Sequence, residues 1–228
     1  MLTLSLSCLL FLGTHLLVSS SGLRAWLVGV VGESAYLAGY SICALVILGV
    51  MIDSYVALEH NTYVWQPAVG HHLIAKIIMP IALVLLAAGL MSKNPTGVKM
   101  EEVVHQVTGY HMPGILKITR HAVQWGILLW SVAHLIANGD AASIVFFGTF
   151  ALLSGLGSMA MDLKRRHLTD PDWLEFYSQT SNIPFAGLLA GKSRLAIGDI
   201  NWISVITGLT LYATLYYFHG LIAGVSLL

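Results

Sequence analysis

The segment His72–Met91, HLIAKIIMPIALVLLAAGLM, contains a single charged side chain, Lys76. A helix of about 20 mostly apolar residues is long enough to cross the hydrocarbon core of a bilayer. The whole chain has this character, since 57% of its 228 residues are hydrophobic and only 10% are charged. A soluble domain carries about 25% charged residues. So few charges cannot cover a water-facing surface, and we therefore expect lipid to surround most of the chain.

Five further stretches are similarly apolar. With the first, the six expected spans run roughly over Leu2–Ser19, Ala35–Ile52, His72–Met91, His121–Ala137, Ala141–Met161 and Ile203–Ile222. Hydrocarbon offers backbone groups no hydrogen-bond partner, and a helix pairs these groups within one segment. The sequence therefore predicts an all-α fold, a polytopic membrane helix bundle of about six transmembrane helices. The first stretch is expected to be a span rather than a signal peptide, because no Lys or Arg precedes it and it contains His15.

Basic residues are divided unevenly between the loops. With six spans, ten of the eleven Lys and Arg residues fall on one side: Arg24, Lys93, Lys99, Lys117, Arg120, Lys164, Arg165, Arg166, Lys192 and Arg194. The other side has both termini and two loops without Lys or Arg. Because Lys and Arg are enriched in cytoplasmic loops, we expect an inner-membrane protein with cytoplasmic long loops and periplasmic termini.

The long loops are expected to contain cytoplasmic interfacial helices. Residues 98–108 have a weakly amphipathic pattern, in which Glu102 and His105 show the i, i+3 spacing of di-iron carboxylate sites. One copy of this spacing without partners is more typical of a solvated face. Asp170-Pro171 predicts a helix N-cap followed by proline at the first helical position. The aromatic residues after it, Trp173 and Phe176 among them, suit the headgroup layer.

Composition and motifs exclude several function classes. The net charge is zero, which argues against a nucleic-acid partner. Cys8 and Cys43 lie in apolar runs and are interpreted as small hydrophobic residues. The chain has no P-loop and none of the patterns G-x-G-x-x-G, C-x-x-C or G-x-S-x-G. The sequence leaves the oligomeric state open.

Two histidines, His15 and His134, are intramembrane by this assignment. Polar groups in hydrocarbon are costly, so each is a candidate functional residue. A neutral imidazole that bridges two helices is the ordinary interpretation of one such histidine. Two in so apolar a chain favour a shared ligand, and neutral imidazole is a good axial ligand for haem iron.

Arg120 and His121, at the entrance to the fourth span, allow a second pairing. At 1.5 Å per residue, His15 lies about 7 Å from the cytoplasmic end of its span and His134 about 20 Å from that end. The axial nitrogens of one iron lie about 4 Å apart. His121 matches the depth of His15 better, so both pairings remain open. Arg120 beside a helix N-terminus fits an anion or cofactor site, or else an interfacial anchor.

Several motifs together resemble the NnrU family of bacterial membrane proteins. They are Phe11–His15, Ile118–His121, Trp125-Gly126, Leu129–Asp140 and Thr180–Phe185. More distantly, the chain is similar to the plant and cyanobacterial zeta-carotene isomerase. The resemblance covers nearly the whole chain and implies a single NnrU-like transmembrane domain over residues 1–228.

The resemblance implies haem b with His15 and His134 as the metal ligands, because they match the isomerase's two ligands by local motif. It implies a role in denitrification and nitrogen-oxide metabolism, or haem-dependent cis–trans isomerisation of a carotenoid-like polyene. The partners would then be the lipid bilayer and an apolar small molecule or a nitrogen oxide. Whether the chain is an enzyme stays open.

Two alternatives accompany this interpretation. Arg120-His121 also resembles a motif of isoprenylcysteine and phospholipid methyltransferases, which bind S-adenosylmethionine at a cytoplasmic membrane face. Both families have proline at the next position, whereas this chain has Ala122. Arg120 and His121 are therefore further candidate cofactor-binding residues. The other alternative is a non-enzymatic accessory factor for a respiratory complex.

Overall fold

The computed structural model describes residues 1–18, 22–97, 100–108, 112–165, 169–225 and 227. Regular structure within these ranges is helical, and an isolated bridge joins Tyr63 to Asp140. The predicted all-α class is confirmed. Ser19, Lys99 and Arg166, which belonged to the expected spans and loops, lie outside the described residues.

Among the described residues, three helices are long and apolar enough to cross a membrane on their own: α3 (Glu33–Val56), α4 (Val69–Met91) and α8 (Ala141–Arg165). A fourth crossing results if α1 (Leu2–Gly13) and the π-helical turn η1 (Thr14–Val18) are counted together with α2 (Gly22–Val31). The protein is therefore a helical membrane protein.

The two remaining expected spans coincide with shorter helices. They are α7 (Ala122–Asn138) with 17 residues and α11 (Trp202–Tyr217) with 16 residues. Such helices are about 25 Å long, somewhat less than the hydrocarbon thickness of about 30 Å. Each of the six predicted stretches is thus mainly helical where described. By length and composition, fewer than six of the described helices could cross a membrane on their own.

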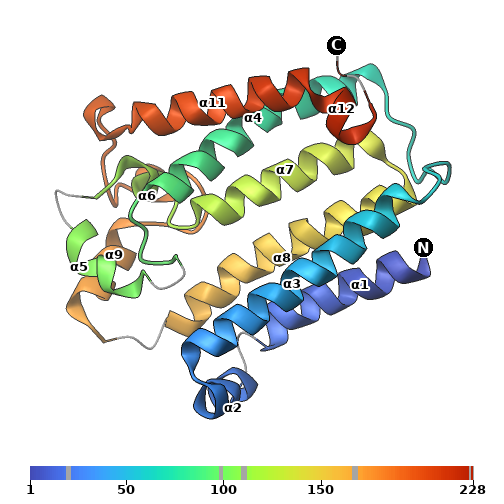
Figure 1. Ribbon diagram of the computed structural model, residues 1–228. Helices are drawn as coiled ribbons and strands as arrows, with labels where there is room; N and C mark the ends of the chain where they lie inside the picture. The colour runs from blue at the N-terminus through green and yellow to red at the C-terminus, as the bar shows by residue number, and fades with distance from the viewer. Residues whose placement is uncertain (19–21, 98–99, 109–111, 166–168, 226, 228) are drawn as a thin grey trace. The chain divides into compact units, whose positions relative to one another are not determined.

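Short helices occupy the connections between the long ones (Figure 1). They are η2 (Glu101–Val103), α5 (Val104–Val107), α6 (Gly114–Ile118), α9 (Pro171–Gln179), α10 (Ala186–Leu189), η4 (Ile197–Asp199) and α12 (His219–Ala223). The start of α9 is as predicted, because Asp170 Oδ1 accepts hydrogen bonds from the backbone N–H groups of Asp172 and Trp173 at 2.9 and 3.3 Å.

The aromatic face of α9 is covered by protein rather than by the headgroup layer. Trp173 is 7% exposed and Phe176 is fully buried. They form a small apolar core with Val104, Val107, Met112 and Leu116. The expectation of a headgroup contact was wrong for these two side chains, because α5 supplies an apolar surface that removes them from water equally well.

The chain divides into two compact units, residues 1–75 with 131–160 and residues 76–130 with 161–228. In the first unit, α1 and α3 lie side by side with the first part of α8 (Figure 1). Tyr55 of α3 stacks on Phe146 of α8 with ring centroids 4.6 Å apart, and its hydroxyl lies 2.9 Å from Ser143 Oγ. The unit boundaries fall inside α4, α7 and α8, and the assignment of one domain to the whole chain stays a prediction.

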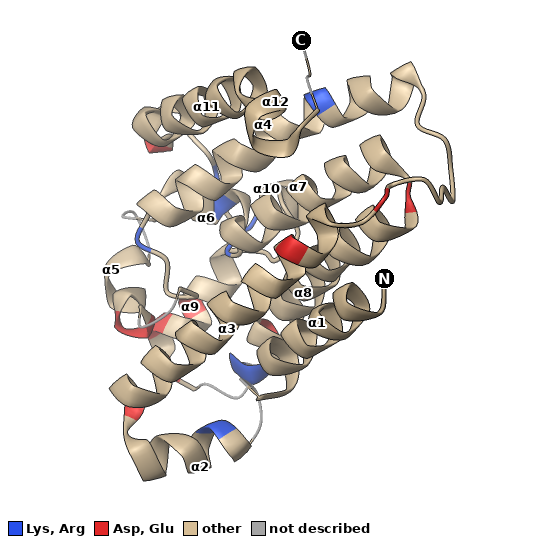
Figure 2. Cartoon of the chain, turned by 45° about the vertical axis from the view of Figure 1, so that its right-hand side comes forward, with Lys and Arg blue, Asp and Glu red and all other residues tan. Residues whose placement is uncertain are grey.

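In the second unit, α7 and α11 approach α4 closely at two glycines. A Cβ atom at Gly126 would lie 2.9 Å from the carbonyl oxygen of Ala82, and one at Gly208 would lie 2.6 Å from Val84 Cα. Neither α7 nor α11 carries an Asp, Glu, Lys or Arg (Figure 2). Where charges are absent, small residues that let backbones approach favour helix association in lipid.

The variant Gly208→Ala is expected to lower the free energy of unfolding by about 1–3 kcal/mol, because the added methyl group must displace the backbone of α4. Titration of the purified protein with sodium dodecyl sulfate, followed by circular dichroism, measures the loss. Gly148→Ala in α8 is the control, since a Cβ there meets nothing within 4 Å. Equal stability of both variants would contradict the close approach.

Candidate functional site

In the second unit, Arg120 and His121 both donate hydrogen bonds to Asp162, which lies near the C-terminal end of α8. Its Oδ1 accepts hydrogen bonds from His121 Nε2 at 2.8 Å and Arg120 Nε at 3.1 Å. The Tyr177 hydroxyl donates to the same oxygen at 3.2 Å, and Asn182 Nδ2 donates to Oδ2 at 3.0 Å. The side chains of Arg120 and Asp162 are 11% and 14% exposed. A buried ion pair offsets its desolvation only when further hydrogen bonds complete it, as they do here.

The backbone around Arg120 is held by two separate segments. Arg120 N–H donates to the Ser181 carbonyl at 3.0 Å. The Arg120 carbonyl accepts hydrogen bonds from Asn94 Nδ2 at 3.1 Å and Thr96 Oγ1 at 2.8 Å. Thr119, extended at φ −157° and ψ 141°, separates α6 from α7. This extended residue and its two neighbouring segments hold Arg120 in place at the start of α7.

Tyr177 supports the Arg120 side chain. Its ring centroid lies 4.3 Å from the guanidinium carbon, within cation–π range. Burial, and then the nearby Asp162 carboxylate, raise the pKa of Tyr177 from 10.0 to about 12. The phenol therefore stays protonated and able to donate. Because its folded pKa is raised, its contribution to stability is present below pH 10 and is lost as the pH rises through about 12.

The His121 ring is fully buried, and its two nitrogens differ in their hydrogen bonding. A carboxylate only accepts hydrogen bonds, so Nε2 carries a hydrogen toward Asp162. Nδ1 is buried without a hydrogen-bond partner. Nδ1 adjoins the side-chain branch, where a group as large as a porphyrin would clash, and the more accessible Nε2 is engaged by Asp162. This arrangement favours a polar anchoring role for His121 over haem ligation.

His15 lies in η1 of the first unit, with its ring centroid 4.2 Å from that of Phe11. Its Nδ1 is 2.9 Å from the Phe11 carbonyl oxygen. Because a carbonyl oxygen only accepts, Nδ1 carries the hydrogen, and in a neutral imidazole the lone pair is then on Nε2. Histidines that bind a metal through Nε2 have this tautomer, in which the Nδ1–H group donates to a carbonyl.

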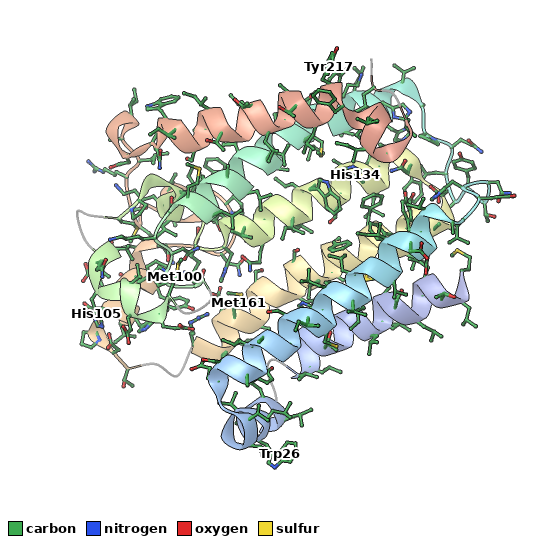
Figure 3. All side chains as sticks on the ribbon, in the orientation of Figure 1. Trp26, Met100, His105, His134, Met161 and Tyr217 are labelled. Atoms are coloured by element: carbon green, nitrogen blue, oxygen red, sulfur yellow. The ribbon has the colours of Figure 1, made fainter. Side chains whose placement is uncertain are left out.

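His134 lies on α7 (Figure 3). Its ring stacks on that of Phe147 with centroids 4.5 Å apart. A continuous series of ring contacts connects it to His15 within the first unit. In order, the rings are His134, Phe147, Phe146, Phe150, Phe11 and His15, with neighbouring centroids 4.2–5.8 Å apart. The structure therefore connects His15 and His134 through one series of aromatic rings.

The two histidine Cα atoms lie at different levels. Met1 and Ala141 line one pocket, so α1 and α8 begin at the same end of the first unit. Fourteen helical steps separate His15 from Met1, about 21 Å, whereas six steps separate His134 from Asp140, about 9 Å. Helical side chains lean toward their own N-terminus. His15 thus leans toward this end and His134 away from it, which reduces the difference in level.

A family model described as NnrU protein matches residues 3–227. The chain belongs to the NnrU family. Searches of curated proteins and of solved structures return no match. The predicted NnrU resemblance is thus confirmed, whereas the assignment of site residues stays a prediction.

Sequence reasoning missed Asp162 as the partner of Arg120 and His121 in this NnrU-family chain. The signal was present, because Asp162 is the one acidic residue between Asp140 and Asp170 and ends an apolar helix. A carboxylate in that position requires cations or donors. Those donors come partly from the Thr180–Phe185 motif, which supplies Asn182.

We expect Asp162→Ala to lower the free energy of unfolding by about 3–5 kcal/mol, because Arg120 would stay buried without its counter-charge. Detergent denaturation of the purified protein measures this loss. Asp53→Ala removes an exposed carboxylate from α3 and is the matched control, with a change of about 0.5 kcal/mol or less. A loss for Asp162→Ala no larger than the control's would contradict the anchoring role.

Proposed function

We propose that this NnrU-family membrane protein binds haem b through His15 and His134. The observation that carries the proposal is the hydrogen bond from His15 Nδ1 to the Phe11 carbonyl oxygen, which directs the lone pair to Nε2. Two imidazoles from separate helices, along a series of phenylalanine rings, suit an apolar macrocycle. Bound haem would supply a redox-active iron with two nitrogen ligands.

The chain's own residues have definite tasks in this proposal. The Phe11 carbonyl fixes the orientation and tautomer of His15, and Tyr40 contacts the same imidazole edge-on with centroids 5.4 Å apart. Phe147 stacks on His134 and limits its rotation. Phenylalanine rings are thus the neighbours of both imidazoles.

The geometry supports the His15–His134 pairing over the His15–His121 pairing. His15 directs the hydrogen of Nδ1 to a carbonyl, whereas His121 directs the hydrogen of Nε2 to Asp162. The two residues of the favoured pair also belong to one unit.

The wider role is part of the same proposal and rests on the family resemblance noted in the sequence. We propose that the haem serves nitrogen-oxide metabolism in denitrification, or cis–trans isomerisation of a carotenoid-like polyene. Both a small uncharged oxide of nitrogen and a polyene can enter apolar surroundings without a charge to desolvate. The proposed location is the inner membrane, with both termini periplasmic and the long loops cytoplasmic, since cytoplasmic loops are those rich in Lys and Arg.

Neither alternative gains support from the described contacts. Arg120, on which S-adenosylmethionine binding would depend, already contacts Asp162, Thr180 and Tyr177. A co-purified respiratory partner, without haem or a methyl donor, would indicate the accessory role. Calorimetry with S-adenosylmethionine would show heat that disappears in Arg120→Ala if the methyltransferase alternative were correct.

The direct test is the absorption spectrum of protein purified from haem-supplemented cells. We expect the spectrum of haem b with two imidazole ligands in the wild type and most of the bound haem lost in His15→Ala and in His134→Ala. His72→Ala, which removes an exposed imidazole, is the control and should retain full haem content.

Two results would overturn the haem proposal. One is a colourless wild-type preparation, and the other is unchanged haem content in both His15→Ala and His134→Ala. Loss of haem in His121→Ala together with full retention in His134→Ala would instead assign the second ligand to His121.

A further inference from the structure

His105, Asp170 and Asp172 bring three ligand groups together in the second unit. One potential ligand atom from each residue lies within 4.8 Å of those of the other two. His105, labelled in Figure 3, comes from α5. The carboxylates come from the start of α9. His105 Nδ1 is hydrogen-bonded to Asp172 Oδ2. The cluster therefore combines an imidazole with two carboxylates from separate elements.

Packing holds the two elements that carry these ligands. Val104 and Val107 on α5 are buried against Trp173 and Phe176 on α9. Each valine or aromatic residue lies within four residues of one of the ligand groups along the chain. This small apolar core therefore fixes the backbone that carries the ligand groups.

Negative charge surrounds the His105 imidazole. The hydrogen bond that His105 donates to Asp172, followed by the charges of Asp172, Asp170 and Glu102, raises the pKa of His105 above its usual value. Glu102 is the residue whose i, i+3 spacing to His105 was noted in the sequence. The sequence showed no partner for that spacing, whereas in the structure Asp170 and Asp172 lie beside His105. The result is a single cluster and not the paired motif of a di-iron site.

We infer that His105, Asp170 and Asp172 form a site for one divalent transition-metal ion of the Zn²⁺ class. Imidazole nitrogen favours such ions over Mg²⁺ and Ca²⁺, and carboxylate oxygen completes a mixed donor set that Zn²⁺ accepts. Ligand atoms bound to one such ion lie at about 2.0–2.2 Å from it, so a modest movement of the exposed side chains closes the site. Three protein ligands leave at least one position for water.

The competing explanation is an ion pair between His105 and Asp172 with no metal. The two explanations make different predictions for the role of Asp170 and for the binding of added Zn²⁺. An ion pair requires only His105 and Asp172, whereas the metal site also uses the Asp170 carboxylate, whose Oδ1 caps α9 through two N–H groups.

Isothermal titration of the full chain with Zn²⁺, after removal of metals with a chelator, tests the site. We expect one Zn²⁺ per chain and at least about tenfold weaker binding in His105→Ala and in Asp172→Asn, since each variant removes a direct ligand. Glu175→Gln is the matched control, because it neutralises an exposed carboxylate of the same helix and should leave the affinity unchanged.

Absence of binding at millimolar Zn²⁺, or equal affinity in the wild type and both ligand variants, would overturn the inference. Circular dichroism verifies that each variant folds, and Asp172→Asn keeps the N-cap Asp170, so at least this variant leaves α9 its first-turn hydrogen bonds. The readout is bound zinc and does not involve haem. Failure here would leave the haem proposal unaffected.

Discussion

Hydrocarbon offers no hydrogen-bond partner, so a polar group within it is costly unless the protein supplies one. Asp162 has such partners, since Arg120, His121 and other donors occupy both carboxylate oxygens. Lys76 in α4 has them too, donating to the Tyr216 hydroxyl at 3.0 Å and to the Leu227 carbonyl at 3.1 Å. The same cost makes the spans helical and confines charges to positions where partners converge.

The two units supply such partners differently. In the second unit, the polar side chains around Asp162 are hydrogen-bond partners of one another. These hydrogen bonds connect segments that are distant in sequence. The first unit instead surrounds His15 and His134 with aromatic rings and uses a backbone carbonyl of the same helix to satisfy His15. The hydrogen bonds to both oxygens of Asp162 stabilise the fold, whereas the proposed haem site rests on imidazoles among aromatic rings.

Features that depend on local sequence could be predicted, and features that depend on distant partners could not. The helical stretches follow from runs of about 20 apolar residues, and the α9 N-cap follows from Asp170-Pro171. The aromatic face of α9 has the same pattern whether lipid or protein covers it, so only the position of α5 decides. The partners of Asp162 lie 15 to 42 residues away, beyond any local pattern. The bond between His15 and Phe11 is local, but it occurs next to a π-helical turn that the composition does not signal.

That turn, Thr14–Val18, gives the first long helix one position where its length can vary. A π-helical turn accommodates an extra residue without ending the helix. Deletion of one residue would convert this turn to ordinary α-helical spacing without displacing Leu2–Gly13. His15 lies within the turn, so a single-residue deletion there would change which side chain faces Phe11 and Tyr40.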